Sequence, residues 1–369
     1  MDSRSNEKMN LMFACKWYRN RELTWSGTAW ALYQGLQNYF EIEDFEMKES
    51  ILQKIARRVR RDNNYGMEKV NRQNQKIFDK KYGKQKKTIF TFAECPYTEN
   101  TVNYVYQDLS ISYLQYLKAK RPDIYAVSEY DKISDEVLAL RDQLQSEYYM
   151  HCSGIFTMGQ WLADFLVEQC GLPAQKVHAV GGGINVDASR IDVSHKQGNK
   201  LLFVGRNFQR KGGEIVLEGF RILRDQYMPE AELYILGTTQ NPIEHEEKGI
   251  HFIGNVSAEQ LSDYYNMCDV FCMPSYFEAY GLVFIEALCY GLPCIGRNRY
   301  AMKEFIEEGV TGKLIEQDDA KEMAEAMYEL LTNKTIQQNV MEKRDWYLHE
   351  YSWSNVCEKI SRQIMQDAK

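Results

Sequence analysis

The fold of this chain is decided by one stretch, Phe277-Glu278-Ala279-Tyr280-Gly281-Leu282-Val283-Phe284-Ile285-Glu286. A short apolar run at 269–273 reads as a buried strand that leads into it, and the apolar pattern from Leu282 to Tyr290 reads as a helix that leads out. The first N–H groups of a helix have no intrahelical partner and carry the positive end of its dipole. Amides near Gly281 therefore predict an anion site, with Glu278 on the loop before it and Glu286 about one turn inside the helix.

A second stretch supplies positive charge at another strand end. It reads Phe203-Val-Gly-Arg-Asn-Phe-Gln-Arg-Lys-Gly-Gly213. Gly205 permits a close backbone approach, and Arg206 and Lys211 follow just beyond the strand terminus. Together with the two glutamates, these cations predict a site that holds a diphosphate between hydroxyl-bearing groups, as in a sugar nucleotide.

The bulk composition is that of a two-domain globular protein. The chain has 369 residues, of which 44% are hydrophobic and 26% are charged. No apolar run approaches the roughly 18–20 residues that span a bilayer, and the N-terminus lacks the apolar core of a signal peptide. The nine cysteines form no Cys-x-x-Cys pair, so we expect buried, reduced thiols and a cytoplasmic protein.

Positive charge is concentrated between residues 51 and 87, although the whole chain carries a net charge of −7. We expect a helical insertion here, and two roles remain open for it: a solvated face, or a patch that meets an anionic membrane. Aromatic residues in this segment are few (Tyr65, Phe78 and Tyr82), which argues against stacking on single-stranded nucleic acid. We therefore predict no nucleic-acid partner.

Short apolar strands alternate with helical patterns along the chain, which is typical of parallel sheets in an α/β fold. The strands we expect cover residues 10–14, 88–92, 102–106, 154–157, 176–180, 200–204, 231–236, 250–253, 269–273 and 293–295. We predict two doubly wound, Rossmann-like domains that face a central cleft. The boundaries we expect are 1–186 for the N-terminal domain, with its basic insertion at about 51–87, 187–199 for a linker, 200–345 for the C-terminal domain and 346–369 for a helix that crosses back to the first domain.

The motifs of the second half occur in an order that resembles the family 4 glycosyltransferases of GT-B fold. They are Val204-Gly-Arg, Arg210-Lys-Gly-Gly, His251-Phe-Ile-Gly-Asn-Val256, the run from Met273 to Pro293, and Glu304-Phe-Ile-Glu-Glu-Gly-Val-Thr-Gly-Lys-Leu314. The resemblance covers about residues 155–355. The first 150 residues match loosely, as expected for an acceptor-side domain.

The resemblance implies retaining transfer of a hexose from a nucleoside diphosphate sugar to a glycan, glycolipid or other hydroxyl acceptor. Glu278 would contact the donor sugar and Glu286 the ribose, while Arg206 and Lys211 would neutralise the departing diphosphate. The remaining donor contacts that it implies are Ala279, Tyr280, Gly281 and Leu282 at the helix start, and Ile253 and Asn255 beside the base. The implied front-face mechanism uses no enzymic nucleophile, and the sequence contains no Asp-x-Asp, so we predict neither a catalytic metal nor a cofactor.

Fewer signals mark the site in the first half of the chain. Gly27, in Trp25-Ser-Gly-Thr-Ala-Trp30, would let a loop approach the donor phosphates, although an ordinary helix cap by Ser26 or Thr28 explains the pattern as well. The family places an aspartate or a histidine of the first domain near the sugar. Asp108, which ends an expected strand, is our choice for this role, with His151 as the alternative.

Three other functions fit the fold. The chain could be a non-catalytic accessory subunit that binds a protein partner, a sugar nucleotide epimerase or a phosphorylase. The presence of Glu278, Glu286, Arg206 and Lys211 together argues against all three. Side-chain identity leaves open which nucleotide, sugar and acceptor are used.

Overall fold

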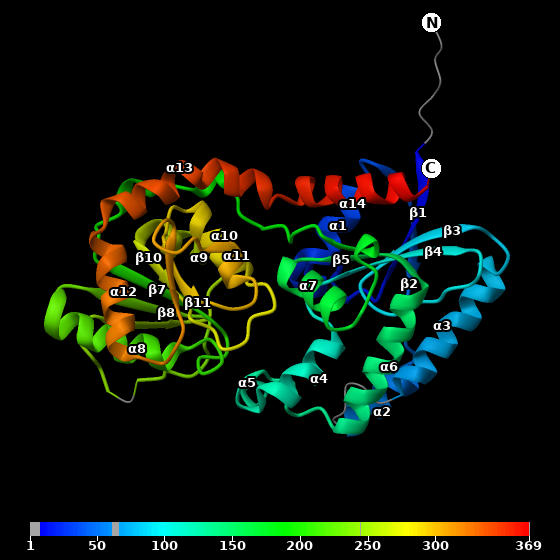
Figure 1. Cartoon of the computed structure of the whole chain (residues 1–369), viewed down its shortest axis with the longest axis horizontal. Helices are drawn as coiled ribbons and strands as arrows, with labels where there is room; N and C mark the ends of the chain where they lie inside the picture. Colours follow the sequence, from blue (N-terminus) through cyan, green and yellow to red (C-terminus); the bar gives the residue numbers. More distant parts are fainter. Residues whose placement is uncertain (1–7, 61–65, 244, 369) are drawn as a thin grey trace, which may run out of the picture. The chain divides into compact units, whose positions relative to one another are not determined.

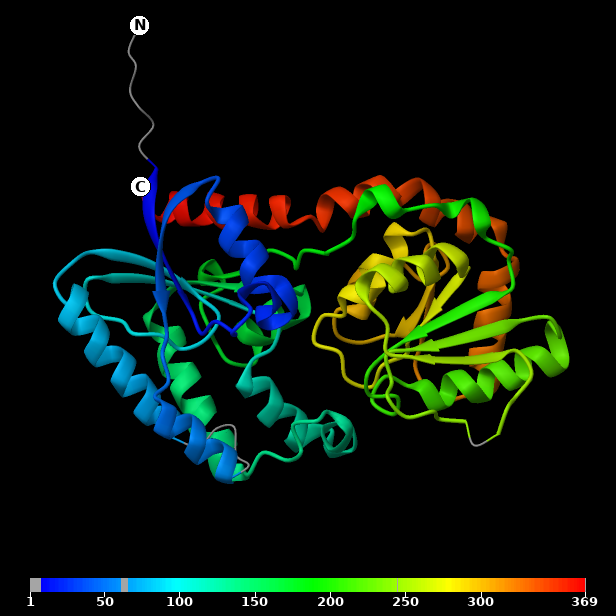
Figure 2. The same ribbon diagram turned by 180° about the vertical axis from the view of Figure 1, so that it is seen from behind.

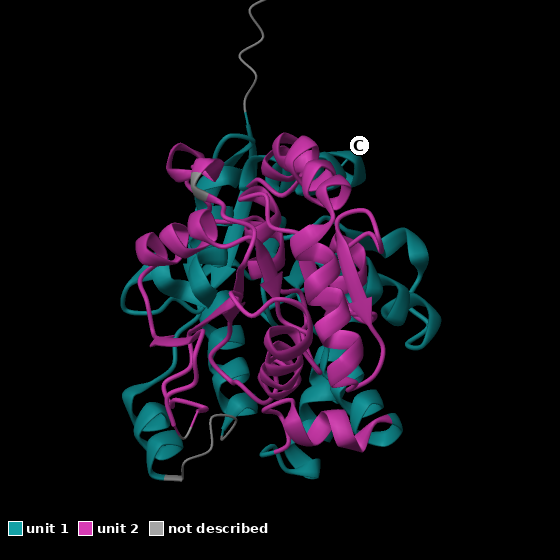
Figure 3. Ribbon diagram, turned by 90° about the vertical axis from the view of Figure 1, so that its left-hand side faces the viewer, with its two compact units in different colours: residues 1–120, 132–182, 353–369 teal, residues 121–131, 183–352 magenta. Residues whose placement is uncertain are grey.

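The computed structural model describes residues 8–60, 66–243 and 245–368, and these form two compact units (Figure 1; Figure 2 shows the reverse side). Figure 3 colours the first unit, residues 1–120, 132–182 and 353–369, apart from the second, residues 121–131 and 183–352. Each unit contains one six-stranded sheet. No helix in the described part of the chain is both long enough and apolar enough to cross a membrane.

The sheet of the first unit has the strand order β2-β1-β3-β4-β5-β6, and every neighbouring pair is parallel. Its strands are β1 (Met9–Cys15), β2 (Phe40–Glu46), β3 (Lys87–Thr91), β4 (Thr101–Gln107), β5 (Cys152–Thr157) and β6 (Val177–Ala179). Its helices are α1 (Thr28–Leu36), α2 (Ile51–Arg60), α3 (Met67–Tyr82), α4 (Ile111–Lys120), α6 (Asp135–His151), α7 (Gln160–Glu168) and α14 (Trp353–Asp367).

The sheet of the second unit has the order β12-β11-β10-β7-β8-β9 and is also parallel throughout. Its strands are β7 (Lys200–Val204), β8 (Glu232–Leu236), β9 (Ile250–Gly254), β10 (Val270–Cys272), β11 (Cys294–Arg297) and β12 (Gly312–Ile315). Its helices are α5 (Pro122–Val127), α8 (Gly213–Ile222), α9 (Ala258–Met267), α10 (Leu282–Cys289), α11 (Met302–Phe305), α12 (Ala320–Thr332) and α13 (Lys334–Glu350). Because the strands are parallel, their carboxyl ends share one edge of the sheet, where ligands bind in such folds.

All ten strands expected from the sequence are present, and two strands were missed. Both missed strands lie at a sheet edge, β2 in the first unit and β12 in the second. β2 contains four acidic residues among seven, and β12 is only four residues long. An edge strand has one neighbour fewer to pack against, so it needs less of the apolar character by which interior strands are recognised.

The helix expected across 346–369 is not a single helix. α13 ends at Glu350 and α14 begins at Trp353, so the chain breaks at Tyr351 and Ser352. The carbonyl of Tyr351 accepts a hydrogen bond from the backbone N–H of Ile184 (2.9 Å), which diverts it from a helical partner. The expected packing of the C-terminal helix on the first domain is confirmed, because α14 packs against α1.

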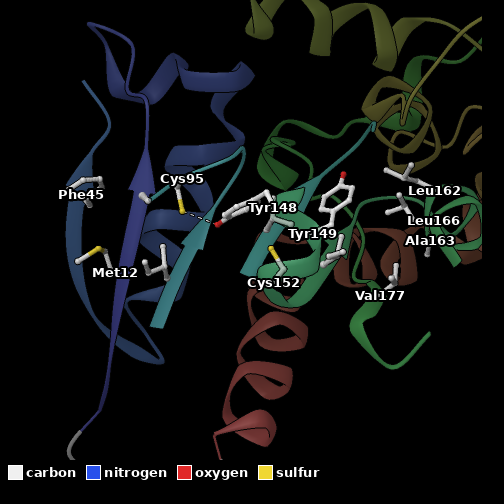
Figure 4. Packing of buried hydrophobic residues seen from close by; sticks show 14 of the residues in the cluster. Met12, Phe45, Cys95, Tyr148, Tyr149, Cys152, Leu162, Ala163, Leu166 and Val177 are labelled. Carbon is white, nitrogen blue, oxygen red and sulfur yellow. Dashed lines mark hydrogen bonds between the residues drawn. The ribbon is translucent and has the colours of Figure 1, made fainter. Parts of the chain in front are cut away.

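A cluster of buried apolar side chains in the first unit draws its members from the strands of the sheet and from α3, α6 and α7 (Figure 4). Cys95 and Tyr148 lie in contact there, with 2.8 Å between Sγ and Oη, and the amide of Asn103 donates to the Tyr148 hydroxyl (3.0 Å). Burial raises the pKa of the Cys95 thiol to about 12, so it is a neutral packing residue. All nine cysteines are free, and only Cys170 is exposed.

The packing of α14 on α1 depends on Gly35, because a Cβ at that position would lie 2.5 Å from the Cys357 sulfur. We expect Gly35→Ala to lower the free energy of unfolding by about 1–3 kcal/mol, since extra atoms in a packed contact force their neighbours to shift. Denaturant unfolding of the two proteins measures this difference.

Cys357→Ala provides the matched background, because the nearest atom to the new methyl group is then the Cβ of residue 357, at 3.4 Å. In that background Gly35→Ala should be neutral or stabilising by up to about 1 kcal/mol, as alanine is the better helix former. An equal loss of stability in both backgrounds would contradict this account of the contact.

Candidate functional site

The candidate site lies at the carboxyl edge of the second unit's sheet, where the loops after β7, β8, β9 and β10 meet. Gly205, just after β7, donates its N–H to the carbonyl of Leu236 (2.9 Å). Gly237, just after β8, donates in turn to the carbonyl of Gly254 (2.7 Å). These bonds place the ends of three neighbouring strands side by side, with the β10–α10 loop next in the sheet order.

Lys211 and Glu278 form an ion pair between the β7–α8 loop and the β10–α10 loop, and each side chain is 12% exposed. Two glycines leave room for the pair. A Cβ on Gly205 would lie 2.8 Å from the Lys211 side chain, and one on Gly281 would lie 2.9 Å from the Glu278 side chain. Gly281 also has a φ of 90°, a conformation that side-chain-bearing residues rarely adopt.

Two arginines hold the loop that carries Glu278. Arg210 donates from Nη1 to the carbonyl of Phe277 (2.9 Å), and Arg297 donates from Nε to the carbonyl of Pro274 (3.2 Å). Glu129 reaches Arg210 with 3.1 Å between Oε2 and Nε. Both ends of the loop are therefore fixed by charged groups before any ligand binds.

Sequence analysis missed Arg210, Arg297 and Glu129. Arg210 stands beside Lys211 in the quoted motif, and that position was its only signal. Arg297 ends β11 and is buried, with 2% exposure, a rare state for an arginine that only the folded structure reveals. Glu129 comes from the first half of the sequence but belongs to the second unit, so no local pattern pointed to it.

Lys211 sits in an environment that opposes its charge in two ways. Burial, and next the charge of Arg210, lower the pKa of Lys211, whereas Glu129 raises it. The Glu278 carboxylate in direct contact favours the charged ammonium form. Lys211 is thus a buried cation whose charge depends on a nearby anion.

Arg206 differs from Lys211 in being exposed. Within the ranges that the structure describes, no hydrogen bond or ion pair holds its guanidinium group. A guanidinium presents a fork of donors that matches two phosphate oxygens. Arg206 therefore provides, on the same loop as Lys211, an exposed cation available to an anionic ligand.

The start of α10 has the geometry of an anion site. Gly281 is its N-cap, no side chain caps the helix, and the N–H of Phe284 bonds back to the Gly281 carbonyl (3.0 Å). The amides at Leu282 and Val283 precede the first helical hydrogen bond. Ala279 and Tyr280 complete the loop, and the buried Tyr280 ring packs edge-on against Phe305 (5.0 Å between centroids). The expected cluster of Lys211, Glu278 and the helix start is thus assembled within one unit.

Glu286 lies on α10 and contacts no cation among the described residues. Its carboxylate accepts a hydrogen bond from the Tyr265 hydroxyl (3.3 Å). Burial raises the pKa of Glu286 to about 7, and the Tyr265 bond opposes this shift. The group therefore changes charge near neutral pH.

Ile253 and Asn255 lie at the end of β9, the edge strand of the sheet. Ile253 is 36% exposed and lines a groove beside α9 with Tyr264. Asn255 is exposed just beyond the strand. Both belong to the carboxyl edge, two strands away from the β7 loop that carries Arg206.

In the first unit, Gly27 is the N-cap of α1 and follows two strained residues. Trp25 and Ser26 have φ values of 49° and 56°, and Gly27 has a φ of 91°. No side-chain hydrogen bond caps α1, so the alternative of an ordinary cap by Ser26 or Thr28 is wrong. Strain of this kind concentrates at ligand-binding loops.

Asp108 directly follows β4, so it lies at the carboxyl edge of the first unit's sheet. Burial raises the pKa of Asp108 to about 6, and hydrogen bonds from its own amide and that of Leu109 oppose the shift. His151 ends α6 and precedes β5, which places it at the opposite edge, where its ring stacks on Tyr97 (4.1 Å). Of the two alternatives, only Asp108 lies at the carboxyl edge of the sheet.

Residues 187–345 match the family model described as glycosyl transferases group 1. The phosphatidyl-myo-inositol mannosyltransferase of Mycolicibacterium smegmatis is 27% identical over 183 residues, which cover 48% of this chain and 47% of that protein. The D-inositol 3-phosphate glycosyltransferase of Corynebacterium urealyticum is 28% identical over 172 residues, 43% of this chain and 41% of that protein. The matched part thus spans about half the length of these curated relatives.

Solved structures resemble the chain over nearly its full length. A glycosyltransferase from Rickettsia africae has a TM-score of 0.64 at 13% identity, covering 98% of this chain and 99% of the other. A sucrose-phosphate synthase from Thermosynechococcus elongatus has a TM-score of 0.65 at 15% identity, with 97% and 99% covered. At such low sequence identities the similarity is evidence for the fold alone. It confirms the GT-B fold expected from the sequence.

The raised pKa of Glu286 makes stability depend on pH. The folded value is about 7 and the ordinary value is 4.5, so between these pH values the unfolded chain loses its proton while the folded chain retains it. Stability therefore falls as pH rises through this window. We expect Glu286→Gln to be more stable than the wild type above pH 7 by about 1–3 kcal/mol, and to show no such gain near pH 4.5.

Denaturant unfolding across this pH range measures the difference, with Glu246→Gln, a change at an exposed loop residue, as the control. A stability difference for Glu286→Gln that is the same at both ends of the range would contradict the buried titration.

Proposed function

We propose that this chain, whose residues 187–345 belong to the glycosyl transferases group 1 family, is a retaining glycosyltransferase. It moves a hexose from a nucleoside diphosphate sugar to a hydroxyl acceptor. The observation that carries the proposal is the buried Lys211–Glu278 pair beside the start of α10, with the exposed Arg206 on the same β7–α8 loop as Lys211. Cations and amides suited to a diphosphate thus adjoin a carboxylate suited to sugar hydroxyls.

In the proposed reaction the bond between the anomeric carbon and the diphosphate oxygen breaks, and the acceptor oxygen bonds to the same face of that carbon. The acceptor proton passes to the departing phosphate oxygen. Negative charge grows on the diphosphate as its bond breaks, so Arg206, Lys211 and the amides of Gly281 and Leu282 stabilise the transition state more than the ground state. The mechanism needs no metal and no enzymic nucleophile.

Glu278 changes partner when the donor binds. In the free protein Lys211 neutralises it; in the complex the ammonium turns to the diphosphate, and the carboxylate accepts hydrogen bonds from the sugar hydroxyls. Glu286 holds the ribose. The remaining donor contacts we propose are Ala279 and Tyr280 on the loop, Ile253 and Asn255 beside the base, Gly27 beside the phosphates and Asp108 beside the sugar.

The acceptor we propose is a glycan or a lipid-linked hydroxyl compound. Support comes from the relative whose name describes mannosyl transfer to phosphatidyl-myo-inositol. For the donor, a fold neighbour from Anabaena was solved with UDP and glucose, which makes a UDP-sugar the first donor to test. We further propose a cytoplasmic protein that lies at an anionic membrane surface through residues 51–87.

Sugar nucleotides should raise the melting temperature of the protein if the donor site is correct. A ligand at 100 times its dissociation constant adds about 2.7 kcal/mol to the free energy of unfolding. We expect one nucleoside diphosphate sugar among a panel to do so, and Arg206→Ala to lose most of the effect. If none of the panel shifts the melting temperature, the donor site is refuted.

Arg206→Ala should lower the transfer rate by roughly 10²–10³-fold, because it removes a donor aimed at the leaving group. The side chain is exposed, so thermal unfolding should not change. The nucleoside diphosphate released from the donor measures the rate. Lys248→Ala, at an exposed residue of the same unit, is the control and should leave the rate unchanged.

Glu278→Ala and Lys211→Ala should abolish transfer, although each leaves a buried charge without its partner and costs stability. Glu278→Gln retains the shape of the side chain but also removes its charge, so thermal unfolding of each variant is measured beside its transfer rate to separate the two effects. Near-normal turnover in Arg206→Ala and Glu278→Gln would show that these residues do not act on the donor. Complete absence of nucleotide release by the wild type, even on long incubation, would favour the non-catalytic accessory subunit.

A further inference from the structure

α2 presents a row of large apolar side chains to solvent. The exposed fractions are 75% for Ile51, 79% for Leu52, 53% for Ile55 and 77% for Val59. With about 3.6 residues per turn, these four positions fall within an arc of about 100° on one side of the helix. Apolar residues on a helix of a globular protein normally face the core, so this arrangement requires a separate explanation.

The opposite side of α2 is fixed to the first unit by charge. Arg57 pairs with Glu49 (2.7 Å), a carboxylate whose side chain is 1% exposed, and Lys16 reaches the same group (3.1 Å). The helix start is held by reciprocal bonds in which Gln53 N–H donates to the Ser50 hydroxyl (3.2 Å) and Ser50 N–H donates to the Gln53 side chain (2.9 Å). Because these contacts set the rotation of α2, the apolar row faces outward.

Cations accompany the apolar row. Lys54 and Arg58 are exposed on α2. On α3, which follows α2 in the chain (Figure 1), four cations recur at helical spacing and line one shallow groove together with Ile77, which is 41% exposed. These cations are Lys69, Arg72, Lys76 and Lys80.

The exposed side chains of α2 and α3 indicate which kind of partner this surface binds. A second copy of the chain would bring two cationic surfaces together, which costs free energy. Single-stranded nucleic acid would find aliphatic side chains where it needs aromatic rings. A helix with an apolar face, a cationic face and low overall hydrophobicity is the form that lies in the interface of a bilayer with anionic lipids.

We propose that α2 lies in the plane of an anionic bilayer, with Ile51, Leu52, Ile55 and Val59 inserted at the boundary between head groups and acyl chains. The cationic row of α3 then meets the lipid phosphates. This inference rests on the membrane location given under the proposed function and refines it. The sequence indicated attraction by charge; the structure adds an apolar insertion that salt does not remove.

Flotation of the full chain with vesicles tests the proposal. The vesicles contain phosphatidylcholine alone or equal parts of phosphatidylcholine and phosphatidylglycerol. The wild type should float with the anionic vesicles and much less with the neutral ones. Replacing the four apolar residues by serine should lower the bound-to-free ratio by roughly 10⁴-fold, since each buried side chain of this size contributes about tenfold. Met150→Ser, at a residue of the same unit that is 68% exposed, is the matched control.

Removing the positive charges of α3 tests the second part of the proposal, the contact between these cations and the lipid phosphates. The variant K69Q/R72Q/K76Q/K80Q should bind anionic vesicles less tightly, by roughly fivefold for each cation, and should lose most of the salt dependence. Its control replaces four exposed lysines of the second unit by glutamine. They are Lys248, Lys303, Lys321 and Lys334.

The serine variant decides the outcome. Flotation equal to that of the wild type would overturn the insertion of α2. So would a wild-type dimer that ignores vesicles and that the serine substitutions dissociate, because the occupant would then be a second copy. The melting-temperature response of the serine variant to the sugar nucleotide should remain that of the wild type, so a failure here is distinguishable from a failure of the donor site.

Discussion

The buried ion pair between Lys211 and Glu278 is the constraint on which the second unit's carboxyl edge depends. Two loops far apart in sequence meet in it, and each charge is tolerated in its buried position because the other is present. Arg210 and Arg297 fix the loop around Glu278 through its backbone carbonyls. The charges at this edge are therefore already in place, which is the condition under which electrostatic stabilisation acts without rearrangement.

The sequence predicts those parts of the fold whose residues are contiguous in the chain, because a local pattern then contains all of them. A strand, a loop that carries Glu278 and a helix that begins after Gly281 are contiguous in sequence, so the position of Glu278 before α10 could be predicted directly. Interior strands carry the apolar character of two buried faces. β2 and β12 lack it because they lie at edges, and the break at Tyr351 depends on a carbonyl bonded by Ile184, about 170 residues away in sequence.

The residues that support the site could not be predicted from a local sequence pattern, because they come from segments that are far apart in the chain. Glu129 reaches Arg210 only because residues 121–131 leave the first unit and join the second. α2 shows the converse case. Its apolar spacing alone predicts a core-facing helix, yet the bond of Arg57 to the buried Glu49 turns that face outward. A polar contact, and not hydrophobic periodicity, sets the orientation.

The two glutamates of the opening motif show how one helix start creates two different acids. Glu278 lies before α10 against an ammonium group, so it is paired and charged. Glu286 lies inside α10, where Tyr265 is its hydrogen-bond partner, and burial raises its pKa to about 7. Eight residues of sequence thus separate an acid that is paired with an ammonium group from one that burial holds near its neutral form. A ribose offers hydroxyl donors, and these favour the ionised form of Glu286. In the proposed donor complex, binding of the nucleotide and ionisation of Glu286 would therefore be coupled, which the sequence spacing alone does not reveal.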